Sequence, residues 1–163
     1  MSFWNYKSFL AAVAVIGLAS GAGAQDDGDT VVLTVTGLAE EHSFGIDDLR
    51  ALETEVFSTT TIWTSGVQEF TGVPLAALLE ALGVTEGEMI ATAVNDYSVT
   101  FPVSEALADG PMVAYLRNGE PMSVRDKGPL WIVYPYDASE DFQSEIVHSR
   151  SIWQLNRIAF RAE

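Results

Sequence analysis

Cysteine is absent from this sequence of 163 residues, and positive charge is scarce. Without cysteine, neither a disulfide nor a thiolate metal ligand can form. Eight lysines and arginines face 23 acidic residues, which gives a formal net charge of -15. A surface this acidic repels polyanions, so the composition argues against binding to nucleic acid or to anionic membranes. Arg50 is the only cation between Lys7 and Arg117, and most positive charge lies in the C-terminal third.

The common catalytic patterns are missing as well. The two histidines, His42 and His148, lie far apart and in no metal-ligand spacing, and we expect each to be an ordinary surface or turn residue. The sequence contains no nucleophile elbow and no glycine-rich phosphate loop, and its carboxylates form no recognisable acid–base pair. No catalytic residue and no metal ligand is therefore predicted.

Residues 1–24 are predicted to form a secretory signal peptide. Lys7 supplies the positive charge, residues 9–19 the apolar segment, and residues 22–24 the small-residue cleavage pattern Ala-Gly-Ala. An uncleaved anchor is the alternative, but the apolar run is shorter than the roughly 20 residues that span a bilayer. We therefore expect cleavage before Gln25, a single domain over residues 25–163, and a periplasmic or secreted protein that does not span the membrane.

The remaining chain alternates between strand and helix patterns. Helices are predicted over residues 46–52, 75–82 and 103–108, and strands over 30–36, 55–63, 89–94, 97–101, 112–117, 130–134 and 151–161. Asn118-Gly119 predicts a hairpin turn, and residues 137–147 read as a polar, acidic excursion. Because the short helices fall between strands at irregular intervals, the fold class is α+β with a mixed β-sheet core.

The predicted fold is arranged around the stretch from Arg125 to Tyr136. Residues 130–134 are apolar without alternation, which predicts a central strand that is buried on both faces, with a proline at each end. The loop before the strand carries Arg125 and Lys127. These cations either offset nearby carboxylates such as Glu120 or bind an anion.

Aromatic, amide and cationic residues recur at the predicted strand ends. Such a set can bind a planar, anionic small molecule by stacking and by charge-assisted hydrogen bonds. The plainer alternative is that the tryptophans belong to the core and that Asn95-Asp96 is only a turn. The candidate binding residues are Trp63, Asn95, Asp96, Tyr97, Arg125, Lys127, Tyr134, Tyr136, Arg150 and Trp153.

Several short motifs resemble a known family. Residues 70–75 with the leucine-rich helix after them, residues 118–122, residues 128–135 and residues 151–155 look like the molybdopterin-binding domain of the sulfite oxidase superfamily. The resemblance covers nearly the whole chain after the leader. It implies an α+β fold with a mixed sheet, a cleft for a pterin cofactor, and a relationship to oxidoreductases.

One position departs from that family. Its enzymes bind molybdenum through a cysteine, and the resemblance places that position at Thr60, which we add to the candidate binding residues. A threonine hydroxyl stays protonated at neutral pH and is a hard ligand where soft sulfur is needed. Two hypotheses follow. Either the domain is non-redox, needs no cofactor, and holds an anionic small molecule or a membrane sensor protein in the former cofactor cleft, or it is an oxidoreductase that keeps molybdopterin without a protein thiolate.

Overall fold

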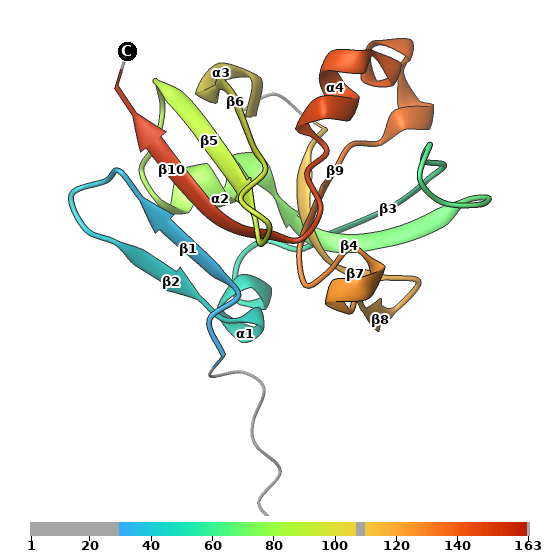
Figure 1. Ribbon diagram of the computed structural model, residues 1–163, viewed down its shortest axis with the longest axis horizontal. Helices are drawn as coiled ribbons and strands as arrows, with labels where there is room; N and C mark the ends of the chain where they lie inside the picture. The colour runs from blue at the N-terminus through green and yellow to red at the C-terminus, as the bar shows by residue number, and fades with distance from the viewer. Residues whose placement is uncertain (1–29, 107–109, 163) are drawn as a thin grey trace, which may run out of the picture.

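The structure, a computed structural model, describes residues 30–106 and 110–162, and its strands form two sheets (Figure 1). The first has the order β2 (His42–Phe44), β1 (Leu33–Thr36), β10 (Leu155–Arg161), β5 (Glu88–Ala93) and β6 (Ser98–Pro102). Its β1 and β10 are parallel, with Val35 opposite Ile158, and its other neighbours are antiparallel. The second, antiparallel sheet has the order β3 (Glu55–Thr59), β4 (Gln68–Pro74), β7 (Met112–Arg117) and β8 (Glu120–Pro121), and β9 (Trp131–Val133) also pairs with β7.

Short helices connect these strands. They are α1 (Ile46–Arg50), α2 (Leu75–Ala81), α3 (Val103–Ala106) and α4 (Glu145–Arg150), with the 3₁₀-helices η2 (Val124–Asp126), η3 (Tyr136–Ala138) and η4 (Glu140–Gln143). The predicted α+β class with a mixed sheet and short helices is confirmed. The strands, however, divide between two sheets where the sequence suggested one, because strand patterns do not reveal which strands pair.

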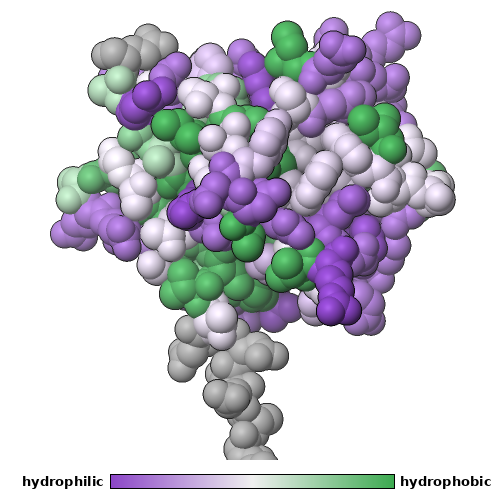
Figure 2. Space-filling view, in the orientation of Figure 1, coloured by the Kyte–Doolittle hydropathy of each residue, from purple (hydrophilic) through white to green (hydrophobic). Residues whose placement is uncertain are grey.

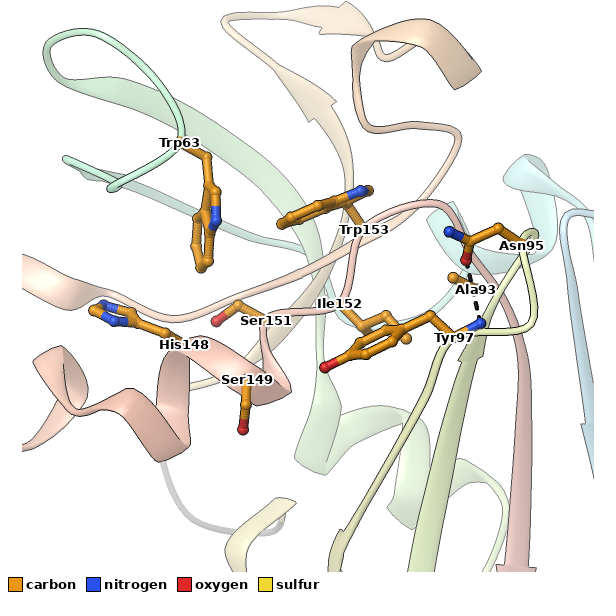
Figure 3. A pocket seen from close by; sticks show the side chains of 9 residues that line it. All are labelled: Trp63, Ala93, Asn95, Tyr97, His148, Ser149, Ser151, Ile152 and Trp153. Carbon is orange, nitrogen blue, oxygen red and sulfur yellow. Dashed lines mark hydrogen bonds between the residues drawn. The ribbon is translucent and has the colours of Figure 1, made fainter.

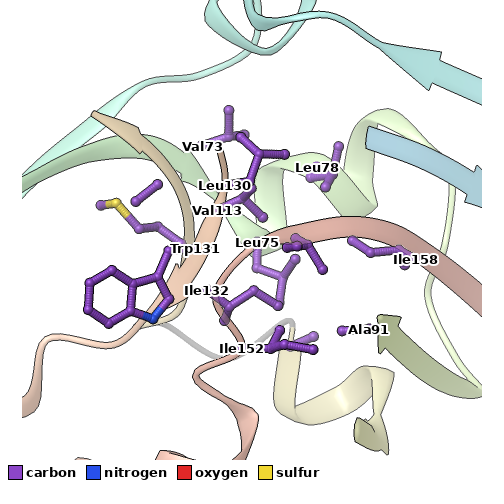
Figure 4. Close-up of a cluster of buried hydrophobic side chains, with 14 of the residues drawn as sticks. Val73, Leu75, Leu78, Ala91, Val113, Leu130, Trp131, Ile132, Ile152 and Ile158 are labelled. Carbon is purple, nitrogen blue, oxygen red and sulfur yellow. The ribbon is translucent and has the colours of Figure 1, made fainter. Parts of the chain in front are cut away.

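The hydrophobic core joins α2 to residues of both sheets (Figure 4). In the leucine-rich helix predicted over 75–82, Leu75, Leu78 and Leu79 have no exposed surface, whereas Leu82, just after the helix, is only partly buried. Burying each such side chain contributes about 1.5–3 kcal/mol to folding. Pro74 ends β4 and caps the start of α2, and Gly83, with a φ of 70°, follows the helix in the left-handed conformation that glycine tolerates best.

Strand β9 is buried as predicted but is not central. Trp131, Ile132 and Val133 are all fully covered, yet they form a ladder with β7 alone. The other edge of β9 is protected by the segment after α4, where the Ile132 amide donates to the Ile152 carbonyl at 2.9 Å and Trp131 forms an isolated bridge with Trp153. That segment takes the place of a further strand.

Four predicted strands, over 30–36, 55–63, 130–134 and 151–161, are shorter in the structure, and the strands β2 and β4 and the helix α4 were not predicted. The strand over 55–63 ends at Thr59, because Thr60 turns away to bond with Asp137. The strand over 151–161 begins at Leu155. The acidic excursion over 137–147 contains η4 and the start of α4, which Ser144 caps by accepting a hydrogen bond from the Val147 amide at 3.3 Å.

One face of the described surface mixes polar and hydrophobic side chains (Figure 2). Figure 2 shows purple side chains over much of one face, with hydrophobic atoms in separate patches between them. No helix within the described ranges is long and apolar enough to cross a membrane. The predicted signal peptide over residues 1–24, and the last two residues of the helix predicted over 103–108, lie outside the described residues.

Candidate functional site

A pocket of about 360 Å³ opens where the two sheets meet, and we call it the aromatic pocket. It draws on the β3–β4 loop, the β5–β6 turn, the end of α4 and the segment that follows α4. Figure 3 shows Trp63 and Trp153 next to each other, with His148 beside Trp63 and with Asn95 and Tyr97 on the other side of Trp153. Its lining residues are Trp63, Ala93, Asn95, Tyr97, His148, Ser149, Ser151, Ile152 and Trp153.

Trp63 is the centre of a cluster of rings. Its ring centre lies 5.6 Å from those of Trp153 and His148, 5.9 Å from Trp131 and 6.1 Å from Tyr136, all at interplanar angles between 67° and 79°. Edge-to-face contacts of this kind contribute about 0.5–1.5 kcal/mol each beyond area burial. The cluster therefore holds two pocket walls, Trp63 and Trp153, in fixed orientations.

Hydrogen bonds hold the loop that carries Trp63. The Trp63 amide donates to the Thr61 hydroxyl at 3.1 Å. Next to it, the Thr60 amide and hydroxyl donate to the two carboxylate oxygens of Asp137, each at 2.6 Å. The Asp137 amide donates in return to the Thr59 hydroxyl at 3.1 Å. The bonds from Thr60 lower the pKa of the Asp137 carboxyl, because they stabilise its charged form.

The floor of the pocket contains a buried relay of hydroxyls. The Tyr136 hydroxyl donates to the Ser151 hydroxyl at 2.6 Å, and the Ser151 hydroxyl donates to the Val147 carbonyl at 2.9 Å. Burial raises the pKa of Tyr136 to about 12, so this phenol stays neutral at physiological pH. At the rim, the Asn95 side-chain oxygen accepts from the Tyr97 amide at 3.2 Å, which leaves the Asn95 amide nitrogen free to donate.

The charge around the aromatic pocket is unusual for so acidic a chain. None of its lining residues is an aspartate or a glutamate. The Lys127 ammonium lies 4.6 Å from the ring centre of Trp153 and 5.7 Å from that of Trp131. Lys127 itself has a φ of 71°, and its carbonyl accepts from the Gln154 amide at 3.0 Å. A non-glycine residue in this conformation costs of order 1–3 kcal/mol, so the rest of the fold compensates for holding the cation on the pocket wall.

The structure brings together some of the predicted binding residues. Trp63, Asn95, Tyr97 and Trp153 line the aromatic pocket, and Lys127 packs on its wall. Thr60 lines a neighbouring pocket.

Other predicted residues have different surroundings. Asp96 pairs with Arg157, and Arg150 pairs with Glu105 and lies over the ring of Phe101. Arg125 is exposed on η2. Tyr134 is buried against Tyr136 and Phe142, and this burial raises the pKa of Tyr134. Among the candidate cations Arg125, Lys127 and Arg150, all within the described ranges, Lys127 is the one that packs on a ring lining the aromatic pocket.

Sequence reasoning missed His148, Ser149 and Ser151. His148 was predicted to be an ordinary surface or turn residue, but it lines the aromatic pocket from α4 and packs edge-on against Trp63. The available signal was Ser144 followed by Glu145, a helix start that would have placed His148 one turn into a helix.

A second pocket of about 370 Å³ lies on the other side of His148, and we call it the aspartate pocket. It is lined by Thr60, Thr61, Ile62, Tyr136, Asp137, Gln143 and His148. Within the described ranges, no group of three or more histidines and carboxylates is arranged to hold a metal ion.

Comparison with known proteins places the chain in a family. Residues 21–139 match the family described as oxidoreductase molybdopterin binding domain. The match covers more than half of the sequence, so the protein belongs to this family. It ends before α4 and β10, so the aromatic pocket lies partly inside and partly outside the matched region.

A solved structure supports the same fold. The sulfane dehydrogenase SoxCD from Paracoccus pantotrophus aligns with a TM-score of 0.63 and 20% sequence identity. The alignment covers 88% of this chain and 41% of the SoxCD chain, so this protein spans less than half of that length. No curated protein matches.

The residues present do not fit a molybdenum centre of the kind that the family resemblance implies. The sequence offers no thiolate, and the Thr60 hydroxyl, at the position assigned to the cysteine, already donates to Asp137. A protonated hydroxyl that is committed to a carboxylate is a poor metal ligand. The aromatic pocket, by contrast, has rings that suit a flat heterocycle.

Proposed function

We propose that this protein is a non-redox member of the molybdopterin-binding family that binds a planar, anionic small molecule in the aromatic pocket. The observation that carries the proposal is a pocket walled by two tryptophans and a tyrosine, without a carboxylate, in a chain of net charge -15. Flat rings stack on such walls. An anion would be repelled over most of this surface, and the absence of carboxylates in the lining removes that repulsion locally.

Polar groups support the choice of an anion. The Asn95 amide nitrogen is a donor at the rim, and Lys127 places a positive charge on the outer wall. The non-redox part rests on Thr60 and Asp137, which fill the assigned thiolate position with a hydroxyl–carboxylate pair. We further propose that the protein is exported after cleavage before Gln25. A membrane sensor protein is the other occupant that we propose for the former cofactor cleft.

The binding proposal can be tested with benzoate as a planar anionic probe. Followed by amide NMR, benzoate should shift Asn95, Tyr97 and Ser149 in a saturable way. Tyr97→Ala should weaken binding roughly 2- to 12-fold, the equivalent of about 0.5–1.5 kcal/mol of aromatic contact. Val56→Ala is the matched control, because Val56 on β3 is 54% exposed and Tyr97 53% exposed. Equal binding by the two variants, or shifts spread over the surface, would refute the assignment.

Family membership favours a second candidate, an oxidoreductase that retains molybdopterin without a protein thiolate. Elemental analysis of protein matured in a molybdenum-replete native host distinguishes the two. The non-redox proposal predicts far less molybdenum than protein. It also predicts that Thr60→Cys alone creates no turnover of sulfite or sulfoxide, because Asp137 still occupies the adjoining space. Near-stoichiometric molybdenum with a redox-active signal would establish the second candidate instead.

A further inference from the structure

The aspartate pocket has the opposite polarity to the aromatic pocket, although the two share His148 as a common wall. Its hydrogen-bond donors are largely used within the protein. The Thr60 amide and hydroxyl donate to Asp137, the Gln143 amide nitrogen donates to the Tyr136 carbonyl at 3.0 Å, and the Tyr136 hydroxyl donates to a serine behind it.

Its acceptors remain available. Each carboxylate oxygen has about two lone-pair directions, and each Asp137 oxygen accepts one hydrogen bond from Thr60. Asp137 forms no ion pair within the described ranges, where every paired arginine uses another carboxylate. The side-chain oxygen of Gln143 likewise has no hydrogen bond to the described part of the chain. The pocket thus presents an exposed, unpaired negative charge beside Ile62 and the ring of Tyr136.

We infer that the aspartate pocket is a second binding site, which takes a cationic hydrogen-bond donor such as a primary ammonium group on a small apolar body. Asp137 receives the ammonium, and Ile62 and Tyr136 contact the apolar part. The bonds from Thr60 keep the carboxylate ionised and fixed in place, so the site is formed before the ligand arrives. This inference holds whether or not the aromatic pocket binds an anion, and the two pockets together would suit a ligand with charges of both signs.

Benzylamine and benzoate test the two pockets separately, because they carry opposite charge on the same ring. Benzylamine should shift the amides of Thr60, Thr61 and Gln143 in a saturable way. Asp137→Asn should weaken its binding roughly tenfold or more, since a hydrogen bond to a charged group is being lost. Asp141→Asn is the matched control, because Asp141 is an exposed carboxylate on the adjoining η4 that does not line the pocket.

Asp137→Asn would also lose benzylamine binding if the substitution rearranged the loop. A second comparison therefore uses only the unmodified protein. Benzyl alcohol has nearly the shape of benzylamine without the charge, and it should bind the unmodified protein at least roughly tenfold more weakly. The inference is overturned if benzyl alcohol and benzylamine bind alike, or if Asp141→Asn weakens benzylamine as much as Asp137→Asn does. The second result would mean general attraction to an acidic surface. Loss of benzoate binding alone would count against the aromatic pocket and leave this site standing.

Discussion

Lys127 provides the sharpest test of anion binding, because its charge can be removed while most of its packing is kept. The ammonium lies 4.6 Å from the ring centre of Trp153, which forms a wall of the aromatic pocket. Replacing Lys127 by Met leaves an unbranched side chain over the ring and removes the positive charge. Lys127→Met should therefore change anion affinity more than it changes stability.

The expected magnitudes follow from the geometry. If the anion stacks on the opposite face of Trp153, the two charges are roughly 8 Å apart, and their attraction is about 1–2 kcal/mol at an effective dielectric constant of roughly 20–40. Losing it weakens benzoate binding roughly 5- to 30-fold. The cation–π contact with Trp153 is worth about 0.5–1 kcal/mol at a partly exposed site, so the free energy of unfolding should fall by no more than that.

Calorimetric titration with benzoate at low and at high salt, with urea unfolding in parallel, measures both effects. The difference between Lys127→Met and the unmodified protein should shrink at high salt, because ions screen the attraction. Arg125→Met serves as the control, since Arg125 is exposed and contacts no ring in the described part of the chain. If Lys127→Met binds benzoate as tightly as the unmodified protein, Lys127 has no part in recognition and the electrostatic reasoning is wrong.

Three further predictions concern export, packing and alkaline stability. Intact mass of protein from a secreting host should begin at Gln25; a full-length mass in material extracted only by detergent would show an anchor instead. Gly72→Ala should lower the free energy of unfolding by about 1–3 kcal/mol or more, because the new Cβ would lie 2.3 Å from the Val113 carbonyl oxygen. An unchanged melting temperature would contradict this close approach. Burial raises the pKa of Tyr136 to about 12, so the unfolded chain loses this proton first, at its ordinary pKa near 10. The free energy of unfolding should therefore decrease from about pH 10 to about pH 12, and Tyr136→Phe should flatten part of that decrease in urea titrations.

Local sequence patterns predicted the parts of the fold that depend on neighbouring residues. The hairpin at Asn118-Gly119 and the helix after Pro74 are in place, because turn geometry and helix capping involve residues within a few positions of each other. The division into two sheets and the edge position of β9 were not predicted. Both depend on pairing between segments far apart in the chain, and an apolar run looks the same in a central strand and in a covered edge strand.

The same distinction applies to the candidate site. Trp63, Asn95, Tyr97 and Trp153 could be chosen because aromatic and amide residues at strand ends are unusual enough to notice, and the structure does bring them together. Asp137 could not be chosen, because its bond to Thr60 joins positions 77 residues apart, and it is one of 23 acidic residues with no distinguishing neighbours.

The segment between α4 and β10 has a consequence for how quickly a ligand can bind. The Ile152 carbonyl accepts from the Ile132 amide of β9, the Leu155 amide donates to the Leu130 carbonyl, and the chain then continues as β10 of the other sheet. Trp153 thus sits on a strap bonded into both halves of the molecule. The amides of Ile132 and Leu155, which make these bonds, should therefore exchange slowly with deuterium. Because this wall of the pocket is already rigid, ligand binding should cost little conformational entropy. Association should therefore proceed in a single fast step without a slower closing phase.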